Sequence, residues 1–184
     1  MKTEFQKMRS EEPYSWLDSE VEASLKHANE ACERFNRIST NDPDYREALE
    51  NMIPGIPKSA IIAPPFRCDH GNGIHIGENV IVNFNCAMMD CADITIGSHT
   101  LIGPNCSFYT SQHPLDYLER RQPKETAKSI VIGDDCWLGG NVTVVGKVSI
   151  GARSVIGAGS VVVKDIPEDC LAVGNPCKVI RKLR

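Results

Sequence analysis

Residues 132–163 read IGDDCW, LGGNVT, VVGKVS, IGARSV, IGAGSV and VV when they are divided into blocks of six. Each block begins with an aliphatic residue, Gly or Val comes second, and a small residue or valine stands in fifth place. The same register runs earlier, with interruptions, from Ile76 to Cys106. A strict period of six fits neither the 3.6-residue period of an amphipathic helix nor a simple stack of hairpins.

This period predicts a solenoid in which three short strands make one turn and the aliphatic residues fill a narrow core. We expect the second-place glycines to form sharp corners, where positive φ is cheap without a side chain. An ordinary β-sandwich with regular turns is the alternative, and the number of matches to the repeat disfavours it. Hexapeptide repeats of this form resemble those of the left-handed parallel β-helix, so the expected fold is mainly β with that architecture.

Two regions depart from the repeat. Apolar residues recur at three- and four-residue steps from Leu17 to Phe35, and a second helix is expected to end near Pro54. We therefore predict a helical N-terminal region over residues 1–55 and the β-helix over 56–184. Within the β-helix the pattern disappears over about 109–129 and returns in phase, which predicts a functional loop that projects from the solenoid. A basic C-terminal tail is expected to fold across the last coil.

The composition narrows the class of protein. The 184 residues carry a formal net charge of −4, which gives no overall signal for a nucleic-acid or membrane partner. The first ten residues lack the apolar stretch of a signal peptide, and no run is long enough to span a bilayer, so we expect a cytoplasmic protein. The eight cysteines form no Cys-x-x-Cys pair. We expect them to be small buried residues, and we expect no metal requirement.

His113 is the candidate catalytic residue. It stands in the expected loop, and Pro114 after it restricts the direction of its backbone. An imidazole held beside a groove is suited to deprotonating an alcohol. Because the chain has no Gly-x-Ser-x-Gly motif for a covalent intermediate, we expect direct attack by a substrate hydroxyl with His113 as the general base.

Several motifs, in order along the chain, resemble those of the sugar O-acetyltransferases of the maltose and galactoside type. The resemblance covers nearly the whole chain, and it implies acetyl transfer from acetyl-CoA to a hydroxyl of maltose, glucose or a galactoside-like sugar. It also implies a homotrimer with sites between subunits. The motifs are PFRCDHG at 65–71, IHIG at 74–77, NFN at 83–85, Met89-Asp90, YTSQHP at 109–114, WLGG at 137–140, IGAGS at 156–160 and Asn175-Pro176.

The same resemblance assigns roles to residues. It makes His113 the general base, places Asn83 in the acceptor pocket, and puts Asp69 and Asp90 at polar positions near the acceptor. Ile81 stands where galactoside acetyltransferases carry a tyrosine, which leaves the identity of the sugar open. For CoA, the resemblance implies small residues that accommodate the pantetheine arm and basic residues near the phosphates. Val163 replaces a threonine near CoA, and Trp137 would line the CoA groove or a subunit contact. These cofactor positions are Gly103, Gly140, Ala158, Val163, Lys164, Lys178, Arg181 and Trp137.

Three other functions fit parts of the sequence. The acceptor hydroxyl could belong to serine or to an antibiotic. A zinc enzyme similar to the γ-type carbonic anhydrases would use three histidines from adjacent coils, and His75, His99 and His113 are the candidates. A non-catalytic scaffold is also compatible with a solenoid.

Overall fold

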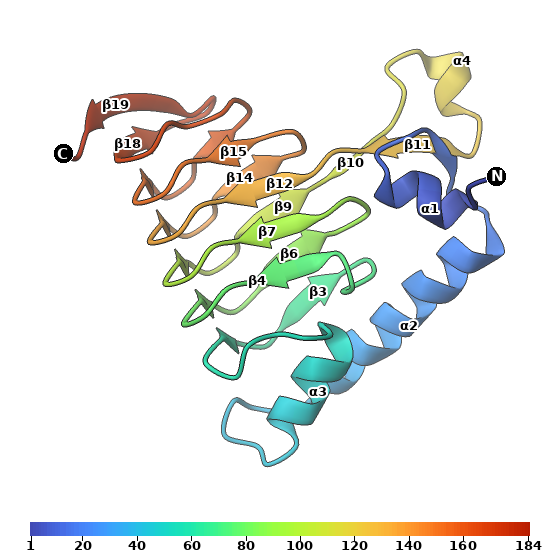
Figure 1. Cartoon of the computed structure of the whole chain (residues 1–184), viewed down its shortest axis with the longest axis horizontal. Coiled ribbons are helices and arrows are strands. Elements are labelled where there is room, and N and C mark those ends of the chain that lie inside the picture. Colours follow the sequence, from blue (N-terminus) through green and yellow to red (C-terminus); the bar gives the residue numbers. More distant parts are fainter.

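The computed structural model describes residues 1–184 and shows a parallel β-solenoid with helices at its N-terminal end (Figure 1). Its strands form three sheets of four, seven and five members. The prediction of a mainly β solenoid is confirmed. The first sheet holds β4 (Ile74–Ile76), β7 (Ile94–Ile96), β12 (Ile130–Ile132) and β15 (Ser149–Ile150). The second holds β2 (Ile61–Ile62), β5 (Ile81–Val82), β8 (Leu101–Ile102), β13 (Trp137–Leu138), β16 (Val155–Ile156), β18 (Cys170–Val173) and β19 (Lys178–Lys182), and the third holds β3 (Phe66–Cys68), β6 (Cys86–Met89), β9 (Ser107–Tyr109), β14 (Thr143–Val145) and β17 (Val161–Val162).

Equivalent repeat positions stack directly on one another. In the first sheet Ile76 pairs with Ile96, Ile96 with Ile132, and Ile132 with Ile150. Of these four, Ile96, Ile132 and Ile150 are almost completely buried. Each coil therefore buries its aliphatic residues against the same residues of the coils above and below.

Glycine is needed in second place for a different reason from the one expected. Gly77, Gly97, Gly133 and Gly139 do not have positive φ. Instead, a Cβ added to Gly133 would lie 2.5 Å from the amide nitrogen of Ala152 in the next coil. Glycine is required there because stacked coils approach each other closely. The positive-φ corner positions come two residues later and are mostly Asn or Asp, which tolerate that region best among residues with side chains.

The fifth-place cysteines are buried and unpaired, as the sequence indicated. Their Sγ atoms point at backbone carbonyls: Cys86 at Gly103, Cys106 at Gly139 and Cys136 at Gly151, each at 3.2–3.3 Å. These thiols fill the corners and act as weak donors to carbonyl groups.

The N-terminal region packs on the solenoid through α2 (Ser19–Phe35) and α3 (Tyr45–Met52). Asp18 caps α2 by accepting hydrogen bonds from the backbone of Glu20 and Val21. Cys32 and Phe35 join the same hydrophobic cluster as the solenoid core. Leu17 and Leu25, which the predicted stripe included, are exposed instead. No helix of the structure is both long enough and apolar enough to span a bilayer.

Between β9 and β12 the chain leaves the solenoid as β10 (Ser111–Gln112), α4 (Tyr117–Arg120) and β11 (Lys124–Ala127). Two N-terminal elements lie against this excursion, α1 (Glu4–Arg9) and β1 (Tyr14–Ser15), and the pattern of the sequence predicted neither (Figure 1). β1, β11 and β10 form a small antiparallel sheet. At the other end of the molecule β18 and β19 pair antiparallel, so the basic tail lies along the edge of the last coil.

Candidate active site

His113 follows β10 directly and lies opposite β11. The Nε2 atom of His113 is 3.5 Å from Oε2 of Glu125, and the imidazole side chain is 57% exposed whereas the Glu125 side chain is only 11% exposed. Both side chains line a cavity of about 460 Å³ together with residues of the excursion such as Gln112, Glu119 and Lys124. A half-exposed imidazole with a sheltered carboxylate behind it is the arrangement of a general base and its orienting group.

Tyr14 completes the contacts of Glu125. β1 pairs with β11 so that Tyr14 lies opposite Glu125, and the phenol of Tyr14 donates a hydrogen bond to Oε1. Tyr14 is almost completely buried. Burial, with the nearby Cys91 and Glu125, raises the pKa of Tyr14 well above its usual value, so the phenol remains a donor. The two oxygens of Glu125 therefore face two different partners.

A buried group of titratable side chains lies behind this contact. The Cys91 thiol donates to Oδ2 of Asp69 at 3.5 Å and lies 4.0 Å from both Nε2 of His70 and Oε1 of Glu125. Burial and the nearby Asp90 raise the pKa of Asp69 to about 6. Burial lowers the pKa of His70 to about 4, so this imidazole is neutral near pH 7. Nδ1 of His70 is 2.9 Å from Oγ of Ser24, which ties α2 to the group.

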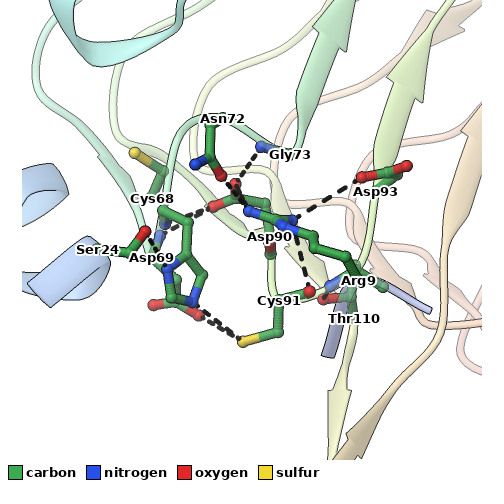
Figure 2. A network of polar contacts seen from close by, with 12 residues as sticks. Arg9, Ser24, Cys68, Asp69, Asn72, Gly73, Asp90, Cys91, Asp93 and Thr110 are labelled. Carbon is green, nitrogen blue, oxygen red and sulfur yellow. Dashed lines mark hydrogen bonds and ion pairs between the residues drawn. The ribbon is translucent and has the colours of Figure 1, made fainter. Parts of the chain in front are cut away.

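Asp90 is fully buried and serves the backbone. Its Oδ1 accepts hydrogen bonds from the amides of Asp69 and His70, and its Oδ2 accepts one from Gly73. The guanidinium of Arg9 lies next to Asp90 (Figure 2), and its Nη1 donates to the backbone carbonyl of Asp90 at 2.6 Å. The Asp90 carboxylate therefore holds the 69–73 turn, and Asp69 alone of the two predicted aspartates is partly exposed.

Asn83 lies apart from this group within one chain. It follows β5 at a corner of the solenoid, is partly exposed, and accepts a hydrogen bond from the amide of Phe84 through its side-chain oxygen at 2.8 Å. No hydrogen bond or ion pair joins Asn83 to His113 or Glu125. A single chain does not bring the predicted acceptor residue onto the predicted base.

The predicted cofactor residues divide into two groups. Gly103, Gly140 and Ala158 lie at one corner in successive coils: a Cβ on Gly103 would be 2.6 Å from the nitrogen of Gly140, and one on Gly139 would be 2.7 Å from that of Ala158. Trp137 is exposed on β13, at the strand that leads into this corner. The second group is exposed at the C-terminal end and consists of Val163 and Lys164 after β17, and Lys178 and Arg181 on β19.

The comparisons with known proteins agree with this architecture. Residues 129–164 match the model of the bacterial transferase hexapeptide family (six repeats). A galactoside O-acetyltransferase of Lactococcus lactis is 36% identical over 181 residues, which cover 97% of this chain and 87% of that protein. The chain belongs to the hexapeptide-repeat acetyltransferases.

Solved structures of this family match over the whole chain. A maltose O-acetyltransferase from Clostridium difficile 630 superposes with a TM-score of 0.96 at 35% identity, covering 100% of this chain and 98% of the other. A hexapeptide-repeat acetyltransferase of Vibrio cholerae, solved in complex with acetyl coenzyme A, gives a TM-score of 0.88 at 37% identity and covers 100% of both chains. The N-terminal helices are therefore shared with these relatives, because the coverage leaves no part of the chain unmatched.

The acetyltransferase family does not favour the zinc alternative. Within one chain, no group of three or more His, Cys, Asp and Glu side chains is arranged to hold a metal ion. His75 is paired with Asp93 at 3.5 Å, and His99 is exposed at a positive-φ corner. The three histidines do not form a metal site in the single subunit.

Two residues of the candidate site could not be predicted from the sequence. Glu125 lies in a stretch of charged residues that looks solvated, and Tyr14 precedes the first helix that the periodicity indicates. Their partnership depends on the β1–β11 pairing, which joins segments more than a hundred residues apart. The only local signal is that Glu125 and Thr126 lead into the small residue Ala127, where the chain returns to the core.

Proposed function

We propose that the protein transfers the acetyl group of acetyl-CoA to a hydroxyl of a maltose-, glucose- or galactoside-like sugar, with His113 as the general base. The observation that carries this proposal is the His113–Glu125 pair at the cavity of the excursion. The choice of donor and acceptor is supported by relatives that match nearly the whole chain. They include a galactoside O-acetyltransferase, a maltose O-acetyltransferase and an acetyltransferase solved in complex with acetyl coenzyme A.

The chemistry needs one base and no covalent enzyme intermediate. The sugar oxygen attacks the thioester carbonyl while His113 takes the hydroxyl proton, and the C–S bond then breaks as the imidazolium returns the proton to the CoA thiolate. Glu125 faces one ring nitrogen, which leaves the other to accept the proton, and its carboxylate stabilises the imidazolium that forms. Asn83 would donate from its amide near the acetyl group, and Asp69 would bind an acceptor hydroxyl.

The cofactor would lie along the glycine corner. No side chain larger than a methyl group is present at Gly103, Gly140 or Ala158, which would let an extended pantetheine arm lie against this corner. Trp137 and Val163 offer apolar contact beside it. Lys164, Lys178 and Arg181 supply cations for the phosphates at the C-terminal end.

We infer that the working unit is a homotrimer with sites between subunits. Four large apolar side chains stand in register on the outer face of the second sheet and are each 43–56% exposed: Ile61, Ile81, Leu101 and Trp137. Such a continuous apolar stripe suits contact with another copy of the chain. A neighbouring subunit would also bring an acceptor residue and the glycine corner to a His113 that one chain leaves half exposed.

The test is an acceptor screen with acetyl-CoA that follows the release of free thiol across glucose, maltose, galactosides, serine and chloramphenicol. We expect turnover with a sugar, and His113→Ala should abolish it while acetyl-CoA binding measured by calorimetry stays unchanged. His99→Ala is the matched control, because His99 is exposed on a corner of the solenoid and should keep full activity. Transfer to serine or chloramphenicol alone would replace the sugar assignment, and wild-type rates in His113→Ala would remove the base.

A further inference from the structure

Tyr14 lies outside the solenoid and contacts Glu125, the carboxylate that faces His113. It comes from β1, which pairs with β11 of the excursion. Its phenol donates to Oε1 of Glu125, while Oε2 of the same carboxylate is the atom 3.5 Å from His113. One carboxylate thus connects a buried phenol on one side with the half-exposed imidazole on the other.

A contact of 3.5 Å to an exposed imidazole does not fix a glutamate by itself, because the side chain has several rotatable bonds. The hydrogen bond from Tyr14 removes that freedom, since the phenol is buried in a small cluster with Met8, Val21 and Cys91. Burial raises the pKa of the phenol above its usual value, so at neutral pH it carries the proton that it donates. The orientation of Glu125 is therefore set from its buried side.

We propose that Tyr14 is a positioning residue for the transfer reaction, which holds Glu125 so that its second oxygen faces His113. This inference rests on the proposed role of His113 as the base. It makes the N-terminal segment, residues 3–15, part of the catalytic machinery rather than a cover on the solenoid. The segment is anchored twice just before Tyr14: Arg9 donates to the carbonyl of Asp90, and Glu11 accepts hydrogen bonds from the amide and hydroxyl of Ser129.

The hydrogen bond also weakens the attraction of Glu125 for a protonated His113. A donor on Oε1 spreads the negative charge of the carboxylate, so loss of this donor should strengthen the attraction between Glu125 and the His113 imidazolium. The other ionisable groups around the cavity are Glu119 and Lys124 from the excursion, with Cys91 and Asp69 on the buried side of Glu125. Tyr14→Phe keeps all four of these side chains, and Cys91 is the one among them that also loses a contact with the phenol.

The experiment compares Tyr14→Phe with the wild-type enzyme in the sugar assay. We expect kcat to fall about tenfold with the KM values for both substrates within about twofold, because positioning of the base is lost while binding is not. The acidic limb of the kcat/KM profile should move up by about 0.5 pH unit. In a Glu125→Ala background, Tyr14→Phe should cause no further loss, since the phenol acts only through that carboxylate.

Tyr45→Phe is the matched control, since its hydroxyl is a partly buried hydrogen-bonding group that donates to the carbonyl of Ile62, remote from the excursion. It should lower stability without moving the pH profile. Nuclear magnetic resonance spectra of the His113 ring test the coupling without any substrate, and Tyr14→Phe should shift the ring resonances at a fixed pH. Shifted His113 resonances with no sugar turnover would sink the proposed function and leave the coupling intact. Unchanged His113 resonances and an unchanged pH profile in Tyr14→Phe would overturn the positioning role.

Discussion

Asp69 and His70 are neighbours whose pKa shifts oppose each other in their effect on stability. The pKa of Asp69 is raised to about 6 in the folded protein, so Asp69 stabilises the folded state fully below pH 3.8, its ordinary pKa. This stabilisation is lost as the pH rises through 6. The pKa of His70 is lowered to about 4, so His70 stabilises the folded state fully above pH 6.5, and this stabilisation is lost as the pH falls through 4. Between pH 4.5 and 6.5 the two effects offset each other.

We predict that Asp69→Asn exposes the His70 effect. The free energy of unfolding of this variant, measured in urea, should rise from pH 4.5 to pH 6.5 by on the order of 1 to 3 kcal/mol more than that of the wild type. His70→Gln is the complementary variant and should show the opposite change in slope, because only the Asp69 effect remains. Identical pH slopes in all three proteins would show that neither group is perturbed as described.

Sequence reasoning reached His113 but not its partners. A histidine in the interruption of a strict repeat is visible in one dimension, as is the proline that follows it. Glu125 and Tyr14 become meaningful only when β1 and β11 pair, and such pairing over more than a hundred residues leaves no periodic trace. Asp90 was predicted near the acceptor, yet its carboxylate is occupied by three backbone amides that only the folded 69–73 turn presents.

Stacking of coils, rather than turn geometry, constrains the second-place glycines. We predict that Gly133→Ala destabilises the protein by about 3 kcal/mol, because the new Cβ would meet the backbone of Ala152, which cannot move independently of its coil. Gly55→Ala is the control: Gly55 has a φ of 78° but nothing within 4 Å of an added Cβ, so the cost should be only about 1 kcal/mol. Equal costs in urea unfolding would restore the turn explanation.

α1 and β1 are too short to be stable alone and depend on contacts with the solenoid. Arg9 supplies the most connected of these contacts, with the carbonyl of Asp90 at 2.6 Å, the side chain of Asn72, and ion pairs to Asp90 and Asp93 at 3.7 and 3.8 Å. This dependence explains why the repeat pattern predicted the coils and missed α1. A helix of six residues is too short to show an amphipathic period of its own.

We predict that Arg9→Met releases the N-terminal segment while the coils stay folded. Backbone amides of residues 4–15 should exchange with deuterium about 10- to 100-fold faster, which corresponds to the loss of hydrogen bonds to a charged group. Lys26→Met serves as the control, since its ion pair with Glu30 joins two largely exposed side chains. Unchanged exchange in residues 4–15 would mean that Arg9 does not hold the segment.

The residues of the proposed site come from three separate parts of one chain. The base and Glu125 come from the excursion, Tyr14 from the N-terminal segment, and the glycine corner from coils of the solenoid on another face. The six-residue period is enough to predict the solenoid from the sequence, because every coil buries the same positions of the repeat. The period does not predict a contact between copies of the chain, since such a contact would depend on outward-facing residues that the repeat leaves free to vary.

We infer that assembly depends on the outward stripe of the second sheet, formed by Ile61, Ile81, Leu101 and Trp137. Leu101 stands in its middle, pairing in register with Ile81 and Trp137, so Leu101→Glu would place a carboxylate in the centre of the inferred contact. We predict that this variant sediments as a monomer and loses sugar acetylation, while its circular dichroism spectrum is unchanged because Leu101 points away from the core. Asn29→Glu, on an exposed position of α2, should remain trimeric and active. A trimer that survives Leu101→Glu at micromolar concentration would place the subunit contact on another face, and an active wild-type monomer would show that one chain completes the site by itself.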